Sequence, residues 1–267
     1  MTDHLIYLYG IVPADAPDPP ADLRGLEGAE VQVVRSPETG IGGIVSQVPA
    51  VDYEENKLNS RLDDLDWIGE RGLAHETVLS WYAEHGPVIP LSLFSLHQDE
   101  ERLRERLAQD AGSNLRMLDS LKGRTEWGVR LWRMDERFRK HMDELSPALK
   151  ALSEEMEGVQ PGRQFLLQKK RDALMKDEMR VASTKVAREF FEAVDALAER
   201  STRMSIPPVP SEGKTLVLHS AFLVGDEDYA EFQRKLSENA NRVADIGFET
   251  EFTGPWPAYH FADESAD

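Results

Sequence analysis

A histidine and a glutamate stand side by side in HETVL, the segment from His75 to Leu79. Zinc proteases use the pattern H-E-x-x-H, in which two histidines one helical turn apart bind the metal and the glutamate acts as general base. Here Leu79 occupies the position of the second histidine, so one metal ligand is missing. His75 also falls on the apolar stripe of the predicted helix, and we expect a hydrogen-bonded core histidine rather than a zinc ligand.

Other catalytic arrangements are also incomplete. His219 and Ser220 are neighbours, but adjacent strand residues point to opposite faces and do not form a nucleophile and its base. The glycines at 40, 42 and 43 lack the spacing of a nucleotide loop and indicate a hairpin or bulge. The acid-rich segments DEER and GDEDY are typical of helix starts. We therefore predict no catalytic, cofactor-binding or metal-ligating residues.

A basic segment between residues 163 and 188 contrasts with the acidic chain around it. It has two interpretations: a docking surface for an acidic partner or for the acidic half of this protein, or an exposed face with i, i+4 ion pairs. The candidate partner-binding residues are Arg163, Lys169, Lys170, Arg171 and Lys176, together with Trp256 near the end of the chain.

The closing segment TGPWPAYHF contains two prolines, Pro255 and Pro257, on either side of Trp256. Because proline lacks an N–H, this segment must lie at a sheet edge or leave the sheet. We expect Trp256 and Phe261 to cover the core of the second domain. An exposed Pro-Trp-Pro that contacts a partner is the alternative.

The elements that position these residues form two groups. Residues 1–122 predict a first α+β domain with helices on one face of an antiparallel sheet. Its predicted strands are 4–12, 29–35, 40–48 and 86–94, and its predicted helices are 61–85 and 99–110.

Residues 123–267 predict a second α+β domain, rich in helix. Its long helix, residues 163–201, would be roughly 55 Å long at 1.5 Å per residue. We expect it to pair as an antiparallel hairpin with a helix over 135–156, which Pro147 kinks or interrupts. The strands are predicted at 126–133, 215–224 and 248–261, with a further helix over 225–247.

The composition limits the possible partners. A net charge of −18 argues against nucleic acid and anionic lipid membranes, since both repel an acidic surface. The chain has no cysteine, so it has no disulfide and no thiol chemistry. No apolar run is long enough to span a bilayer, and the N-terminal segment lacks the basic region of a signal peptide, so we expect a cytoplasmic protein.

Several segments, in their order and separation, resemble the gas vesicle accessory family GvpF/GvpL. They are IYLYGIV, HETVL, PVIPLSL, EWGVRLW, PGRQFLLQKKR, AFLV and FTGPWPAYHF. One segment departs from the family pattern. The family commonly has arginine, phenylalanine, glycine and threonine where this chain has Ser92, Leu93, Phe94 and Ser95.

The resemblance implies a ferredoxin-like N-terminal α/β sandwich and a modified ferredoxin-like C-terminal domain with a long helical hairpin. It also implies an accessory or minor structural role in gas vesicles, in contact with the main shell protein and other accessory proteins, without a cofactor. The alternative is a small-molecule enzyme or a ligand-sensing module that uses the cleft between the domains. In the enzyme, His75, Glu76 or His219 would be the acid–base groups.

Overall fold

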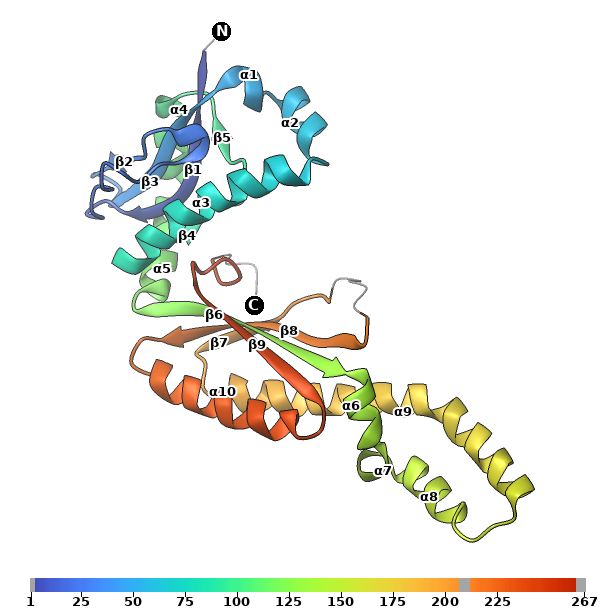
Figure 1. Cartoon of the computed structure of the whole chain (residues 1–267). Coiled ribbons are helices and arrows are strands. Elements are labelled where there is room, and N and C mark those ends of the chain that lie inside the picture. The colour runs from blue at the N-terminus through green and yellow to red at the C-terminus, as the bar shows by residue number, and fades with distance from the viewer. Residues whose placement is uncertain (1–2, 207–211, 263–267) are drawn as a thin grey trace. The chain divides into compact units, whose positions relative to one another are not determined.

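The computed structural model of the chain describes residues 3–206 and 212–262 (Figure 1). The chain forms two compact units, each with its own antiparallel sheet. Met1–Glu126 and Pro255–Asp267 make up the first unit, and Trp127–Gly254 make up the second. The predicted boundary lay at 122/123, and the prediction gave all of the last segment to the second domain.

The first unit contains a five-stranded sheet in which β3 and β1 are central, with the order β2-β3-β1-β4 and β5 also paired to β1. Its strands are β1 (His4–Pro13), β2 (Gln32–Ser36), β3 (Ile41–Pro49), β4 (Ile89–Pro90) and β5 (Leu96–His97). Its helices are η1 (Leu26–Gly28), α1 (Ala50–Tyr53), α2 (Glu55–Arg61), α3 (Leu65–His85), α4 (Glu100–Gln109) and α5 (Ala111–Leu121). The glycines of the predicted hairpin lie in the turn from β2 to β3 and in β3 itself, as the sequence indicated.

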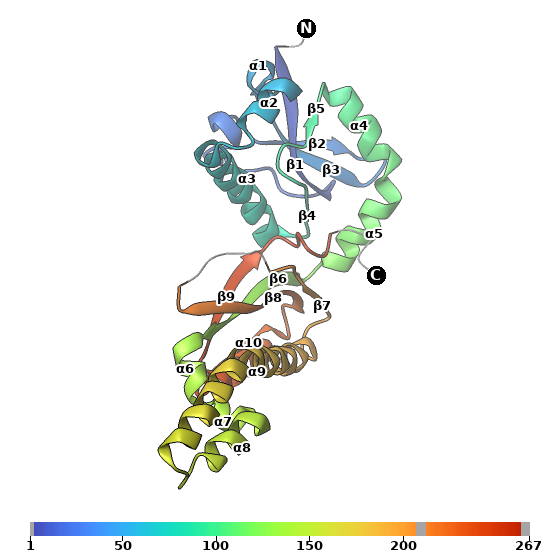
Figure 2. The ribbon, with the colours of Figure 1, turned by 90° about the vertical axis from the view of Figure 1, so that its right-hand side faces the viewer.

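Helices cover both faces of this sheet: α3 lies on one side, and α4 and α5 lie on the other (Figure 2). A Cβ atom on Gly10 of β1 would lie 2.8 Å from Leu79 of α3, while one on Gly43 of β3 would lie 3.4 Å from Leu107 of α4. β1 and β3 are accordingly buried along most of their length. The prediction of helices on a single face was therefore wrong for this unit. Strands of a sheet that is covered on both sides are continuously apolar, whereas strands of a sheet covered on one side alternate between apolar and polar residues.

The strand predicted over residues 86–94 is present but much shorter, since only Ile89 and Pro90 pair with β1. Pro90 has no N–H to donate, and Phe94 adopts a left-handed backbone with a φ of 70°. The chain therefore leaves the sheet after β4, although the Leu91 N–H still donates to the Tyr9 carbonyl at 2.9 Å.

The second unit has a four-stranded sheet with the order β7-β8-β6-β9. Its elements are β6 (Arg124–Met134), α6 (Asp135–Lys140), α7 (Met142–Leu145), α8 (Pro147–Glu155), α9 (Pro161–Asp195), β7 (Arg200–Arg203), β8 (Lys214–Gly225), α10 (Tyr229–Ala244) and β9 (Phe248–Trp256). α9 and α10 pack on one face of the sheet (Figure 1). Trp127, Val129 and Leu131 of β6 are buried in that core, while the residues between them are half-exposed. This alternation is typical of a sheet covered on one side.

The predicted helical hairpin is present, formed by α8 and the N-terminal part of α9. Of the two predicted effects of Pro147, a kink or an interruption, the structure shows an interruption. It is the first residue of α8, and the Ser146 hydroxyl caps that helix by accepting from the Leu149 N–H at 3.2 Å. α9 ends at Asp195, earlier than predicted. None of the described helices is both long enough and apolar enough to cross a membrane.

β9 is an edge strand, as the two prolines of the closing segment predicted. The prediction that Trp256 and Phe261 cover the core of the second domain was wrong. The chain from Pro255 onward belongs to the first unit, where Phe261 is buried and Tyr259 packs against the core. Trp256 remains 39% exposed. The physical reason is the hydrogen bonding of Tyr259 and His260, described below.

Candidate functional site

His75 is a core residue of the first unit, as the sequence predicted. The Tyr7 hydroxyl donates to His75 Nδ1 at 2.8 Å, and His75 Nε2 donates to the Leu91 carbonyl at 3.1 Å. The Tyr7 oxygen also accepts from the Phe94 N–H at 3.2 Å. Burial lowers the pKa of His75 to about 4, so the ring is neutral near pH 7. Since both of its nitrogens are engaged, His75 is not available as a metal ligand or a catalytic base.

Glu76, the next residue, binds the closing segment of the chain. Its Oε2 accepts from the Tyr259 hydroxyl at 2.7 Å, and its Oε1 accepts from the Ser80 hydroxyl at 3.1 Å. Burial, followed by the hydrogen bond to Glu76, raises the pKa of Tyr259. Tyr259 is therefore a neutral donor to a carboxylate.

Glu126 makes a second contact with the same segment. Although only 2% exposed, it accepts from the His260 N–H at 2.9 Å and pairs with His260 Nδ1 at 2.6 Å. The hydrogen bond to Glu126 raises the pKa of His260. We call Glu76, Glu126, Tyr259 and His260 the C-terminal clasp.

The C-terminal clasp gives Tyr259 and His260 of the closing segment defined partners in the first unit. Two carboxylates receive donors from consecutive residues, so the segment is fixed to the first unit by side-chain and backbone bonds together. Sequence reasoning missed Glu126 and Tyr259 as partners. Two signals were present in the sequence: Glu126 at the start of EWGVRLW, and the adjacent Tyr259 and His260 in the closing segment. Nothing in the sequence shows that these residues contact one another.

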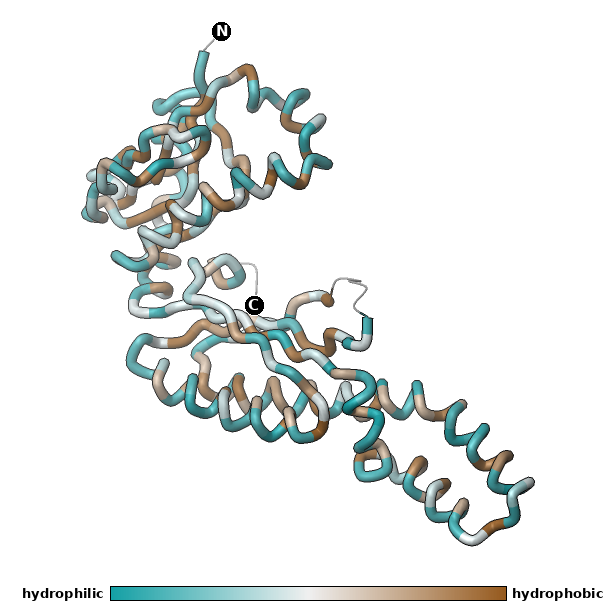
Figure 3. The backbone as a smooth tube through the Cα atoms, in the orientation of Figure 1, coloured by the Kyte–Doolittle hydropathy of each residue, from teal (hydrophilic) through white to brown (hydrophobic). Residues whose placement is uncertain are grey.

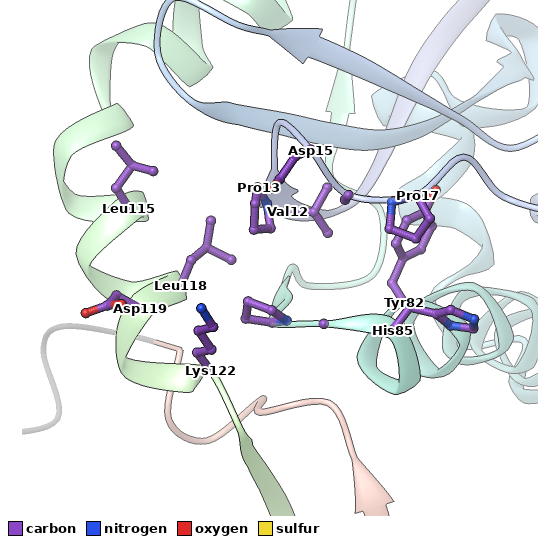
Figure 4. Close-up of a pocket in the computed structure, with 13 residues that line it drawn as sticks. Val12, Pro13, Asp15, Pro17, Tyr82, His85, Leu115, Leu118, Asp119 and Lys122 are labelled. Atoms are coloured by element: carbon purple, nitrogen blue, oxygen red, sulfur yellow. The ribbon is translucent and has the colours of Figure 1, made fainter.

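A cavity of about 400 Å³ lies elsewhere in the first unit (Figure 4). Its apolar wall includes Val12 of β1 and Leu118 of α5, and its polar groups include Asp15, Asp119 and Lys122. Two of these groups are acidic and one is basic. The cavity is an apolar recess with a mixed-charge rim, and we assign it no ligand.

The predicted basic residues divide into two kinds. Arg171 has structural partners: its guanidinium lies 2.9 Å from Asp143 and donates to the Ser153 hydroxyl at 3.2 Å, with 19% of its side chain exposed. Arg163 pairs with Glu155 at 2.6 Å across the hairpin. Lys170 and Lys176 are exposed.

The end of the hairpin exposes two large apolar side chains among these bases. Phe165 is 60% exposed and Leu166 is 67% exposed, although apolar residues of this size are usually buried. The ammonium of Lys169 lies 4.8 Å from the centroid of the Phe165 ring, and Lys170 follows on the same exposed helix. We call Phe165, Leu166, Lys169 and Lys170 the hairpin tip. The sequence analysis identified the charges of the hairpin tip but not its exposed apolar pair.

The candidate acid–base residues are divided between the two units. His75 and Glu76 have the separate partners given above, and His219 lies in β8 of the other unit. Within residues 3–206 and 212–262, no group of three or more histidine, aspartate or glutamate side chains is arranged to hold a metal ion.

The family model of the gas vesicle synthesis protein GvpL/GvpF matches residues 5–263. The chain belongs to the GvpL/GvpF family. GvpL/GvpF proteins are gas vesicle synthesis proteins, and this member accordingly has a role in gas vesicle formation. Its relatives include gas vesicle protein L of a Streptomyces species, which is 27% identical over 98% of this chain and 94% of its own length. Gas vesicle protein L2 of Halobacterium salinarum is 25% identical over 97% of this chain and 91% of its own length.

Two solved GvpF structures share the fold. The crystal structure of GvpF from Anabaena has a TM-score of 0.70 and 22% identity, and it covers 98% of this chain and 99% of the other. GvpF from Microcystis aeruginosa has a TM-score of 0.64 and 16% identity, with 97% and 99% covered. The chain therefore has the GvpF fold throughout.

Five of the seven segments that carry the family resemblance supply contacts in the first unit, while PGRQFLLQKKR and AFLV lie in α9 and β8 of the second. IYLYGIV supplies Tyr7, HETVL supplies His75 and Glu76, and PVIPLSL supplies the Leu91 carbonyl. EWGVRLW supplies Glu126, and FTGPWPAYHF supplies its partner at the chain end. In this GvpL/GvpF protein these segments hold one another in place.

Proposed function

We propose that this GvpL/GvpF protein is a cytoplasmic assembly protein, accessory or minor structural, that binds the main shell protein of the gas vesicle. The proposal depends on one observation, the exposed Phe165 and Leu166 of the hairpin tip with Lys169 and Lys170 beside them. An apolar pair ringed by charge is suited to contact another protein.

The partner is inferred from the chemistry of a gas-filled shell. Its main protein must be strongly apolar on the side that faces the gas, so the free subunit is prone to aggregate. A binder with a net charge of −18 stays soluble while its few exposed apolar side chains cover that surface. We further propose that other gas vesicle accessory proteins bind the same assembly, that no cofactor takes part, and that the role is not catalytic.

The ferredoxin-like description of the two units is also a proposal. The second unit supports this proposal. Along the chain its elements are β6, helices, β7, β8, α10 and β9, and its sheet has the order β7-β8-β6-β9. Both orders are those of the split βαβ pattern, with the helical hairpin as an insertion.

The test is co-purification of the shell protein with the tagged full chain. We expect Phe165→Ser with Leu166→Ser to lower the recovered shell protein at least about tenfold, the loss that follows from removing a buried apolar anchor. Lys169→Glu with Lys170→Glu should lower it less and make binding less sensitive to salt. Val181→Ser is the matched control, because Val181 is a 56% exposed apolar residue farther along α9.

Trp256 remains a second candidate contact, and Trp256→Ser tests it in the same assay. Circular dichroism and melting temperature establish that each variant is folded. Undiminished recovery with the Phe165 and Leu166 double variant contradicts the role of the hairpin tip. Normal vesicles in a strain that lacks this protein contradict the function itself.

A further inference from the structure

A second exposed apolar surface lies on α3 in the first unit, separate from the hairpin tip. Leu65 is 81% exposed and Leu73 is 71% exposed, the two highest values among the large hydrophobic side chains that the structure describes. Gly69 lies between them at helical spacing, with Gly72 beside it. We call Leu65, Gly69, Gly72 and Leu73 the leucine stripe. Figure 3 shows hydrophobic and hydrophilic residues alternating along this helix.

The two glycines have no role inside their own unit. Glycine is the least favourable helix residue after proline, and both lie in the interior of α3 with helical backbone. A Cβ atom added at either one would meet no atom of another described element within 4 Å. By contrast, a Cβ on Gly10 would lie 2.7 Å from the Ile89 carbonyl oxygen. Packing therefore requires the glycine at 10 but not those at 69 and 72.

A bare helix backbone between two exposed leucines fits the close approach of another helix. Small residues allow two helix backbones to approach closely, and the two leucines then contact different turns of a helix that lies along the stripe. The distance from Leu65 to Leu73 along the axis is about 12 Å at 1.5 Å per residue, or two helical turns. The stripe is thus long enough to hold a short helical segment.

The charge beside the stripe determines which helix it accepts. Asp66 and Glu70 lie one turn apart on one flank, and Asp63 precedes the helix. The Glu70 side chain is 82% exposed and lies 3.7 Å from Arg71, whose stronger contact is with Glu27. An acidic flank attracts a helix that carries lysine or arginine beside its apolar face.

We propose that the leucine stripe of α3 binds an amphipathic α-helix of a partner protein, with small apolar residues on its contact face and basic residues on its flank. A second copy of the same stripe packed antiparallel is disfavoured, because the Asp66 and Glu70 carboxylates of the two copies would then face one another. The proposal goes beyond shell-protein binding by the hairpin tip and uses none of its residues.

The first experiment uses two synthetic helical peptides, each about 18 residues long so that it is helical in isolation. Both have alanine and leucine on one face; one has lysine on its flanks and the other has glutamate. Isothermal titration calorimetry with the full chain should show that the lysine peptide binds at least about tenfold more tightly than the glutamate peptide. The preference should decrease as salt is added, since it depends on charge.

The second experiment fills the stripe without weakening the fold. Gly69→Gln with Gly72→Gln replaces two poor helix formers by good ones, so the melting temperature should stay the same or rise. The same change should weaken binding of the lysine peptide at least about tenfold, because the new side chains occupy the contact face. Leu65→Gln with Leu73→Gln should also weaken it, while Val51→Gln, an exposed apolar position of α1, should leave it unchanged.

Equal affinity for the two peptides, or no binding by either one, overturns the proposal. So does unchanged affinity in the Gly69 and Gly72 double variant. Light scattering of the chain alone tests whether a second copy of the chain occupies the stripe instead. If the unmodified chain self-associates and the glycine double variant is monomeric, the stripe binds a second copy and the partner-helix proposal is wrong. Shell-protein recovery with the hairpin-tip variants is measured separately, so failure of one proposal is distinguishable from failure of the other.

Discussion

Nδ1 of His260 lies 2.6 Å from Oε1 of Glu126, although the two residues are 134 positions apart in the chain. This contact fixes the closing segment to the first unit, and the same glutamate also accepts from the His260 N–H. Glu126 is buried. If the His260 side chain is removed, the Glu126 carboxylate keeps the His260 N–H as a donor but loses the imidazole.

We expect His260→Ala to lower the free energy of unfolding by about 1–3 kcal/mol, the range for removing one partner of a buried polar group. Glu126 raises the pKa of His260 above 6.5, so the charged pair stabilises the folded state fully below pH 6.5. That contribution is lost as the pH rises through the raised pKa. Urea unfolding should therefore show a larger difference between the unmodified chain and His260→Gln at about pH 5.5 than at about pH 8.5. His4→Gln, at an exposed position, is the control, and a difference that grows with pH contradicts the pairing.

His75 should respond to pH in the opposite direction. Its pKa is lowered by burial to about 4 from 6.5, so the unfolded chain binds a proton more readily than the folded one. Stability should fall as the pH falls from 6.5 toward 4. In His75→Gln this part of the loss should disappear, while the amide can still accept from Tyr7 and donate to Leu91. Denaturant unfolding across that range measures it, and an unchanged slope would exclude His75 as the source.

Arg171 and Lys170 are neighbours in the sequence, but we predict different consequences for their replacement. Burial opposes charge on Asp143, but the hydrogen bond from Arg171 outweighs it and lowers the pKa of that carboxyl. Arg171→Gln should lower the free energy of unfolding by roughly 1–2 kcal/mol and raise the pKa of Asp143, as NMR titration would show. Lys170→Gln, at an exposed position, should change stability by less than about 0.5 kcal/mol. Equal effects would mean that Arg171 has no structural role.

Phe94 has a φ of 70°, a backbone conformation that glycine adopts without strain and that other residues rarely adopt. Its ring stacks on Trp67 with the centroids 5.3 Å apart, which offsets the strain. We expect Phe94→Gly to be more stable than Phe94→Ala by about 1 kcal/mol, since both lose the stacking but only alanine keeps the left-handed strain. Thermal unfolding of the two variants decides this. Leu96, in β5, is the control position. There the alanine variant should be more stable than the glycine variant. If the alanine variant is also the more stable one at Phe94, the prediction is wrong.

Much of the fold could be predicted from the sequence because it depends on local patterns. The glycine hairpin, the interruption at Pro147, the paired long helix and the edge position of β9 follow from residue types and periodicities that act over a few positions. Composition and the family segments predicted an α+β chain of the GvpL/GvpF family. The basic residues of α9 were visible as well, but their exposure was not, so Arg171 and Lys170 looked alike.

The sequence by itself determined that the chain is an acidic α+β protein, that His75 belongs in a core and that the closing segment leaves its sheet at two prolines. Only the tertiary structure decided where that segment goes, which face of α9 is exposed and that both faces of the first sheet are covered. Pairing of Glu76 with Tyr259 and of Glu126 with His260 joins residues 183 and 134 positions apart. Such contacts depend on how elements pack in space, and a periodic pattern reports only which side of one element is apolar.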